Sequence, residues 1–390
     1  MTEAKPPLRV LLFSPLEGRD PSSGDTAFTA AMLDSPPIGI EYTTYGAAID
    51  AGSVRIRGRR PRNGRSSPLD LVLLAVRVLE SSLRRLGLLY REPIWYVSIS
   101  PNAFDLVHQH LFAVRQVGPR VPVVSSAGYP LRDLYAAREG WGRVRRHLAD
   151  ALERVYARAA RIDNPYFRVG RPGVAAAYTE RFRQELAKSV KAPVGVLGAA
   201  LPELDIPAKR SDGHTLGFVG HDFDLKGGPL AVEAFRLLRK DDQRIRLVVA
   251  SGSRVADSRY PDDGIWFAIG ATRQAVLNEL LPSVDVLLLP SKADCGVPFS
   301  VLEALQSGAS AVVSANPWLD DRLAPPAVER CGLTAEEVSA AASRLLAQDP
   351  LVRQRDARDL GSREFSTPRQ HADLLRLYRL ALEDAAGGGS

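Results

Sequence analysis

The sequence predicts an α/β protein built from two Rossmann-like units. Three observations carry this prediction. At 390 residues the chain is longer than one ordinary core requires, which favours two domains. Short runs rich in Val, Ile and Leu alternate with longer helical patterns, which is typical of parallel sheets covered by helices on both faces. The same alternation starts again after residue 214, which indicates a second sheet.

The first unit should extend over residues 1–200 and the second over residues 201–365. The strands expected in the first unit are residues 9–14, 40–45, 105–110, 121–126 and 192–197. Those expected in the second are residues 215–220, 245–250, 265–270, 284–290 and 310–315. Residues 200–214 are rich in proline and charged residues and show neither the alternation of a strand nor the 3.6-residue period of a helix. They are therefore the best candidate for the linker.

The chain becomes almost wholly helical after Ala335. In a last helix, expected over residues 366–385, Leu374, Leu375, Tyr378 and Leu382 recur at helical spacing. We expect this face to dock back on the first unit. Two facing sheets of this kind are expected to place the carboxyl ends of their strands along a shared central cleft, where ligands bind.

Composition excludes several classes of protein. Hydrophobic residues make up 45% and charged residues 25% of the chain, which is typical of a soluble globular protein. The two cysteines, Cys295 and Cys331, match no zinc or disulfide spacing, which fits a reducing cytoplasm. We expect no metal and no cofactor. The apolar run from Val10 to Phe13 is too short for a signal peptide, and that from Leu69 to Val76 is too short to span a bilayer.

The net charge of +6 is concentrated in the segment from Arg55 to Arg65, and an arginine-bearing apolar segment follows it. This basic region suits an anionic membrane surface, an acidic acceptor or nucleic acid, or it is simply a solvated loop. Few aromatic residues accompany the arginines, so nucleic acid is disfavoured. The stretch from Leu69 to Leu89 is expected to be buried in the first core; the alternative is a membrane face that meets a lipid-linked acceptor.

A glycine- and lysine-containing turn follows the first strand of the second unit. Gly220 ends the strand, and Lys226, Gly227 and Gly228 lead into a helix. Glycines let backbone amides approach a phosphate, the helix N-terminus adds partial positive charge, and lysine neutralises a leaving diphosphate. The alternative is a solvated lysine in a tight turn. Neither GxGxxG nor GxxxxGK[ST] is present, which argues against dehydrogenases and P-loop enzymes.

A second motif runs from a strand through a loop with Gly and Pro into a short helix that carries Glu303. A carboxylate one turn into such a helix can accept hydrogen bonds from the vicinal hydroxyls of a ribose. The alternative is structural, because Ser300 and Glu303 have the S-x-x-E spacing of a capping box.

Together the two motifs resemble the retaining GT-B glycosyltransferases of the family 4 type, over roughly residues 215–314. The residues that carry this resemblance are Gly217, Gly220, Lys226 to Gly228, Pro290, Ser291, Asp294, Glu303, Ala304 and Gly308. It implies a GT-B fold, a diphosphate clamp at Lys226 and a ribose ligand at Glu303.

The resemblance also implies donor contacts from Gly270, Val297 and Ser300.

The chain departs from the family pattern at three positions. In the family pattern the first acidic residue stands eight positions before the second, which in this chain falls on Cys295. Asp294 stands nine positions before Glu303. His221 stands where a basic residue often follows the strand-ending glycine, and Ala127 where members often carry a histidine near the donor sugar.

The first unit resembles the family less closely. Gly24 lies in a segment similar to the glycine loop that approaches the donor phosphate and the acceptor; alternatively, Ser23 or Asp25 caps the next helix. His108 and His110 end a strand and are expected to alternate to opposite sides, so that only one faces the cleft. We favour His110 for acceptor or donor-sugar contact, the alternative being a histidine satisfied at the strand end.

The resemblance implies a metal-independent glycosyltransferase that uses a UDP- or GDP-type sugar donor, with retention of configuration. The donor is a co-substrate, and the acceptor is an unidentified glycan, lipid-linked group or small molecule. The rival hypothesis is a non-catalytic nucleotide-sugar-binding homologue that serves as a partner subunit. A nucleotide-sugar epimerase is less favoured, because the sequence shows no clear acid and base for that chemistry.

Overall fold

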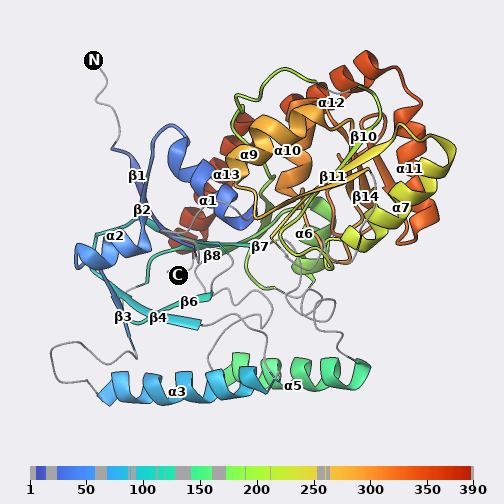
Figure 1. Ribbon diagram of the computed structural model, residues 1–390. Coiled ribbons are helices and arrows are strands. Elements are labelled where there is room, and N and C mark those ends of the chain that lie inside the picture. Colours follow the sequence, from blue (N-terminus) through green and yellow to red (C-terminus); the bar gives the residue numbers. More distant parts are fainter. Residues whose placement is uncertain are drawn as a thin grey trace, which may run out of the picture. The chain divides into compact units, whose positions relative to one another are not determined.

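The computed structural model describes residues 6–14, 24–57, 68–86, 88, 94–110, 113–118, 120–127, 142–159, 173–188, 190–210, 212–252, 260 and 264–387. The chain forms two compact units (Figure 1). Unit 1 comprises residues 1–19, 32–197 and 371–390, and unit 2 comprises residues 20–31 and 198–370. The sequence places the boundary near residue 200, and the units divide before Gly198.

Unit 1 is centred on a six-stranded parallel sheet in the order β2-β1-β5-β7-β8-β9. Its strands are β1 (Leu8–Phe13), β2 (Ile40–Thr44), β5 (Leu106–His110), β7 (Val123–Ala127), β8 (Gly173–Ala177) and β9 (Val194–Val196). Helices α2 (Tyr45–Asp50) and α6 (Glu180–Ala187) connect strands of this unit. The five strands expected here are confirmed. Strand β8 was missed because its sequence, GVAAA, is poor in the residues that favour strands.

A small second sheet in unit 1 contains β3 (Val54–Ile56), β4 (Ile94–Ile99) and β6 (Ala113–Gln116), in the order β3-β4-β6. Aromatic rings lead outward from the main core to this sheet: Phe13 stacks on Tyr45, and Tyr45 contacts Trp95 of β4. Arg77 of helix α3 (Pro68–Arg85) then lies over the ring of Trp95. Helix α5 (Arg143–Ala159) belongs to the same unit.

The expected burial of residues 69–89 is wrong. In α3, Leu71, Val72, Val78 and Leu79 are each more than half exposed, whereas Glu80 is buried and bonded to Arg84. The helix therefore buries the carboxylate of Glu80 and turns much of its apolar surface outward. The predicted basic cluster lies mostly in residues 58–67, outside the described residues.

Unit 2 is centred on a second six-stranded parallel sheet, in the order β12-β11-β10-β13-β14-β15. Its strands are β10 (Thr215–Val219), β11 (Arg246–Ser251), β12 (Ile265–Ile269), β13 (Val286–Leu289), β14 (Ser310–Ser314) and β15 (Val328–Cys331). All five expected strands are confirmed, and β15 is additional. The two parallel α/β sheets confirm the predicted fold class.

Helices cover both faces of the second sheet. Figure 1 shows α7 (Gly228–Asp241) and α11 (Ala335–Leu346) on one side of it and α10 (Phe299–Ser307) with α12 (Pro350–Glu364) on the other. Helix α7 connects β10 to β11 and α10 connects β13 to β14, so neighbouring strands β10 and β13 send their chains in opposite directions. The carboxyl ends of such a strand pair form the crevice where ligands bind in open α/β sheets.

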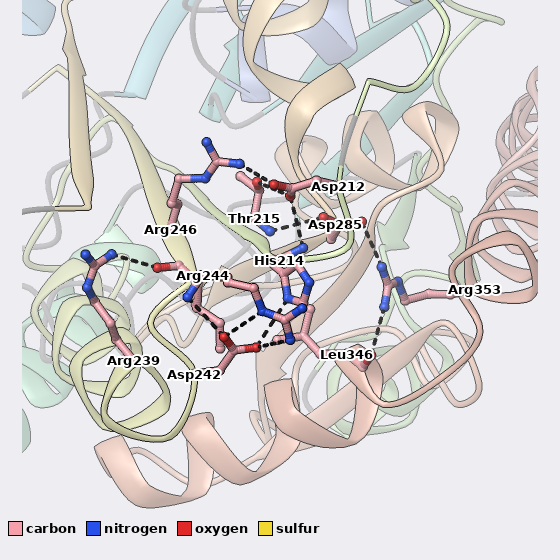
Figure 2. Close-up of polar contacts among 11 residues, drawn as sticks. Asp212, His214, Thr215, Arg239, Asp242, Arg244, Arg246, Asp285, Leu346 and Arg353 are labelled. Atoms are coloured by element: carbon pink, nitrogen blue, oxygen red, sulfur yellow. Dashed lines mark hydrogen bonds and ion pairs between the residues drawn. The ribbon is translucent and has the colours of Figure 1, made fainter.

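A buried ion pair lies at the amino ends of the strands of the second sheet, opposite the crevice. Figure 2 shows Arg353 of α12 beside Asp285, which precedes β13, with Nη2 2.7 Å from Oδ1. Both side chains are only 2% exposed. The amide of Thr215 donates to the other carboxylate oxygen, and Arg353 also donates to the carbonyl of Leu345. These groups are paired, as a buried charge requires, and they lie at the amino ends of the strands, away from the crevice.

The last helix, α13 (Thr367–Gly387), confirms the expected C-terminal helix. From His371 onward it belongs to unit 1, where Leu374, Leu377, Tyr378 and Ala381 are buried. Leu375, expected on the docked face, is 37% exposed instead. The buried residues follow the i, i+3, i+4, i+7 spacing of one helical face.

Candidate functional site

The loop after β10 places Lys226 at the crevice of unit 2. The amide of Gly220 bonds the carbonyl of Ala250 at the end of β11, which fixes the start of the loop. The amide of Lys226 bonds the carbonyl of Asp222, so the loop turns tightly before α7. A Cβ on Gly220 would lie 3.0 Å from Cβ of Lys226, and the glycine therefore lets the lysine stem pass over the strand end.

Gly227 must be a glycine for two reasons. Its φ of +83° lies in the left-handed region that side chains disfavour. A Cβ there would also lie 2.1 Å from the carbonyl oxygen of Pro290, in the loop after β13. The two loops that flank the crevice therefore touch backbone to backbone, and Gly227 is the N-cap from which α7 begins.

Lys226 and Asp294 form an ion pair across these loops, with Nζ 2.6 Å from Oδ1. Asp294 is 9% exposed, and its other oxygen, Oδ2, is buried with no hydrogen-bond partner in the described part of the protein. A buried carboxylate oxygen without a donor is costly, so a ligand hydroxyl or amide that donates to it would be favoured. The one-residue displacement of Asp294 in the sequence thus does not keep it from Lys226.

The loop that carries Asp294 is held by its neighbours. Asn316 donates from Nδ2 to the carbonyl of Asp294, and the amide of Gly296 bonds the carbonyl of Trp318. On the other side, the amide of Lys292 bonds the carbonyl of Leu225. The carboxylate is therefore positioned by backbone contacts on both sides of it.

Glu303 lies one turn into α10 and pairs with Arg273, whose Nε is 2.7 Å from Oε1. Arg273 opens the short helix α9 (Arg273–Ala275), which follows β12. The Glu303 side chain is 7% exposed. Burial raises the pKa of Glu303 above its ordinary value, and the charge and hydrogen bond of Arg273 oppose that rise.

The capping-box alternative for Glu303 is wrong. Helix α10 begins at Phe299, its N-cap is Pro298, and no side chain caps it. Ser300 lies inside the first turn and is half-buried, and the Glu303 carboxylate is held by Arg273. The sequence pattern fits the spacing of a cap, but the preceding proline shifts the helix start by two residues.

The remaining residues expected at the donor lie along the same edge of unit 2. Gly270 follows β12 with a φ of +70°, and its amide bonds the carbonyl of Ser251. His221 is exposed, and its ring lies so close to Gly252 that a Cβ there would be 2.5 Å from Nδ1. Val297 is buried in the second core. Its side chain is therefore committed to packing.

Helix α1 (Gly24–Asp34) begins at Gly24, and residues 24–31 belong to unit 2. The ring of Phe28 meets the ring of Phe299 edge to face, with centroids 6.5 Å apart. The start of α1 is thereby brought to the start of α10. The alternative in which Ser23 or Asp25 caps the helix concerns side chains outside the described residues.

The expected alternation of His108 and His110 is wrong, because residues two apart on a strand share a face. Both rings are buried and both lie within hydrogen-bond distance of Ser126 Oγ, at 3.0 Å from His108 Nε2 and 3.1 Å from His110 Nδ1. Gln109, between them, points the other way and donates to Ser125. Burial lowers the pKa of each histidine to about 3, so both are neutral.

The two histidines lie in a continuous hydrogen-bonded row. His108 Nδ1 is 2.8 Å from the hydroxyl of Tyr378, which is 2.8 Å from that of Tyr42. At the other end His110 Nδ1 is 2.8 Å from the hydroxyl of Tyr178. His108 and His110 are therefore satisfied within unit 1, which supports the structural alternative for His110.

Sequence reasoning missed Arg273, Ser126 and Tyr178, and it named Tyr378 only as part of the docked helix face, not as a partner of His108. Arg273 lies 30 residues before Glu303, and no local pattern links the two. Within the described ranges, no group of three or more His, Cys, Asp or Glu side chains is arranged to hold a metal ion. None of the helices described is long and apolar enough to cross a membrane.

Comparison with known proteins finds a similarity to one family within unit 2. Residues 213–347 match the family model of glycosyl transferases group 1, about a third of the chain. The matched residues, which are similar to this family, include the Lys226–Asp294 and Arg273–Glu303 pairs. None of the curated proteins matches the sequence significantly.

Among solved structures, the chain is similar to the crystal structure of TarM, with 12% identity and a TM-score of 0.49, over 70% of this chain and 54% of TarM. A mutant of S. aureus TarM in complex with Fondaparinux, alpha-GlcNAc-glycerol and UDP gives the same identity and TM-score, over 70% of this chain and 55% of that one. The chain thus spans about half the length of these structures.

Proposed function

We propose that the protein transfers a sugar from a UDP- or GDP-sugar donor to an acceptor, with retention of configuration and without a metal ion. The observation that carries the proposal is the Lys226–Asp294 pair, which lies in the group 1 glycosyltransferase region and leaves Oδ2 of Asp294 buried without a partner. An ammonium group and an open carboxylate oxygen side by side suit a ligand that carries both phosphate and hydroxyl groups.

In this proposal Lys226 binds the diphosphate of the donor. Its positive charge stabilises the negative charge that develops on the leaving diphosphate, and the N-terminus of α7 directly after it adds partial positive charge. The ammonium group exchanges Oδ1 of Asp294 for phosphate oxygens or contacts both. Oδ2 of Asp294 accepts a hydrogen bond from a hydroxyl of the donor sugar.

Glu303 is proposed to bind the ribose hydroxyls. An ionised carboxylate is the stronger acceptor, and Arg273 favours the ionised form. The chain's own residues at the carboxyl ends of β10, β12 and β13 thus supply contacts for phosphate, sugar and ribose. Gly24, Gly270, His221 and Ser300 are proposed as further donor contacts.

The decisive experiment measures release of free nucleoside diphosphate from a panel of UDP- and GDP-sugars, with and without cell extract as the acceptor source. Lys226→Ala should lower turnover at least tenfold, because one well-placed charge contributes on the order of 2–4 kcal/mol to the transition state. Lys292→Ala is the matched control, because Lys292 is an exposed lysine two residues from Asp294. The configuration of the product at the anomeric carbon tests retention.

Calorimetry separates this proposal from its rival, a nucleotide-sugar-binding partner subunit, which is motivated by Ala127 and His221 at positions where the family pattern carries other residues. Binding of UDP or GDP without turnover of any donor would favour the subunit. Unchanged turnover in Lys226→Ala would remove the proposed site. Interconversion of donor sugars without free diphosphate would indicate an epimerase.

A further inference from the structure

Helix α3 presents an apolar face to solvent. Viewed along the helix, Leu71, Val72, Ala75, Val78 and Leu79 fall on one side, at the i, i+3, i+4, i+7 spacing of a single stripe. The large members of this stripe are 55–60% exposed, and Leu86, which continues it, is 67% exposed. An ordinary surface helix turns such a stripe toward the core.

The opposite face of α3 is fixed to unit 1 and explains the orientation of the helix. Leu73 and Glu80 are buried, Glu80 is bonded to Arg84, and Arg77 lies over the ring of Trp95, 5.5 Å from its centroid. The Glu80–Arg84 pair lies within α3 and neutralises the buried carboxylate, whereas the contact of Arg77 with Trp95 of β4 joins the helix to another element and fixes its rotation about its axis. The outward apolar stripe is therefore the consequence of specific inward contacts.

Helix α5 repeats the arrangement. Val144, Leu148, Ala151 and Val155 are exposed and lie on one side at i, i+4, i+7, i+11 spacing, and Val144 is 82% exposed. One flank of this row carries exposed Arg143, His147 and Arg154. More than half of the exposed large apolar side chains in the described ranges lie on α3 with Leu86 and on α5.

We propose that the outward faces of α3 and α5 are a docking surface for the anionic surface of a lipid bilayer, into which the aliphatic side chains insert. The apolar stripes supply burial in the boundary between headgroups and acyl chains, and the flanking arginines pair with anionic headgroups. This inference rests on exposure and charge in unit 1 and does not depend on the proposed transfer reaction in unit 2.

Charge favours a bilayer over a second copy of the chain or a protein partner. The chain carries a net charge of +6, and arginines recur beside the exposed row of α5, so two copies meeting through these faces would bring like charges together. The exposed stripe residues are all aliphatic, whereas cores of protein interfaces are enriched in aromatic residues and depleted of charge. Aliphatic side chains flanked by arginine are the composition of helices that lie in a membrane interface.

The test is co-sedimentation of the full chain with vesicles of phosphatidylcholine, with and without phosphatidylglycerol. We expect binding to the mixed vesicles only, and weaker binding as salt is raised. Val78→Ser with Leu79→Ser should reduce the partition coefficient at least about tenfold, because two inserted side chains are lost. Arg143→Gln with Arg154→Gln should reduce it by about fivefold per arginine.

The matched control is Leu351→Ser with Val352→Ser, an adjacent exposed pair of the same two residue types on α12 of unit 2. This pair should leave binding unchanged, and circular dichroism should show all variants folded. Equal binding of the wild type to both kinds of vesicle, or full binding of the Val78→Ser/Leu79→Ser variant, would overturn the proposal. A dimer in light scattering that the same variant abolishes would overturn it in favour of a second copy.

Discussion

Arg273 opposes the effect of burial on the pKa of Glu303. Burial alone raises the pKa of Glu303, and the guanidinium 2.7 Å away is the group that opposes this rise. Arg273 is itself only about three-quarters buried, so it can hold the carboxylate and still contact a ligand. If Glu303 binds ribose as an anion, Arg273 acts as a positioning residue for it.

Arg273→Gln should therefore shift the pH dependence of UDP or GDP binding. As pH falls, protonation of Glu303 removes the anion that binds the ligand, so binding is lost on the acidic side of the pH profile. Without Arg273 the pKa of Glu303 rises further, and this acidic loss of binding moves to higher pH. Calorimetry across a pH series measures the shift, with Arg273→Lys as the conservative control. An unchanged limb together with weakened binding at every pH would mean that Arg273 contacts the ligand only.

Gly227→Ala should disrupt the site more than the same change at Gly270. Both positions have positive φ, which costs an alanine roughly 1 kcal/mol, but only at Gly227 would the new Cβ meet a backbone oxygen, at 2.1 Å. At Gly270 nothing lies within 4 Å. Thermal unfolding should show a larger loss for Gly227→Ala, and donor turnover should fall with it; equal losses would contradict the close approach to Pro290.

For single residues, the sequence was enough to predict the loops of the site but not the ion pairs between their side chains. Lys226, Asp294 and Glu303 stand in recognisable motifs, so their positions at the ends of β10 and β13 could be predicted. The contact from Arg273 to Glu303 joins helices that follow β12 and β13, and local spacing carries no information about it. The proline that moves the start of α10 likewise overrode the S-x-x-E pattern.

Helix α13 is held to unit 1 by polar contacts as well as by apolar packing. Its Tyr378 is fully buried, and its hydroxyl lies between Tyr42 of β2 and His108 of β5. Both histidines of the row are neutral, since burial lowers each pKa to about 3. Protonation of either ring would place an unpaired charge in the core beneath this helix.

Acid should therefore destabilise unit 1. A histidine whose pKa is lowered in the folded state contributes stability that is fully present above its unfolded pKa of about 6.5 and is lost as pH falls toward 3. Each ring should add about 1.4 kcal/mol per pH unit to the slope of unfolding free energy in that window. Urea titrations at several pH values measure the slope, which His110→Gln should reduce; His147→Gln, an exposed histidine on α5, should leave it unchanged.

Most strands of the two parallel sheets were predicted, whereas the small sheet was missed, including β4, although its sequence IWYVSI is rich in residues that favour strands. The Val-, Ile- and Leu-rich strands of both parallel sheets were found from composition. Strand β8 is mostly alanine, and β3 and β6 have three and four residues, too few for a period to appear. Helix α3 shows a clear helical period, but the period could not say which face is buried, because the deciding contact comes from Trp95 of β4.

For the whole molecule, the two units have separate hydrophobic cores and an interleaved chain. One core gathers residues of β1, β4 and β5, and the other gathers residues of the sheet from β10 to β15. Residues 20–31 belong to unit 2 although both flanking stretches belong to unit 1. The repeated strand pattern could predict the two units. It could not predict that the start of α1 belongs to unit 2, because the helical pattern of α1 is the same whichever unit it packs against.

Asp285→Asn should lower the stability of unit 2 by about 3–5 kcal/mol, because it leaves the buried guanidinium of Arg353 without its counter-charge. Replacing both residues, as Asp285→Leu with Arg353→Met, should cost less than the single change. Chemical denaturation followed by a core probe in unit 2 measures the difference. If the single variant were as stable as the wild type, the ion pair would not contribute to the fold.

The outward stripe of α3 also bears on how the protein behaves at the bench. A row of uncovered valine and leucine side chains adheres to other apolar surfaces when no bilayer is offered. We therefore expect the purified chain to bind phenyl resin, to precipitate on concentration, and to be kept monodisperse by a mild detergent. Poor recovery after purification would then report an accessible helix face rather than a misfolded protein.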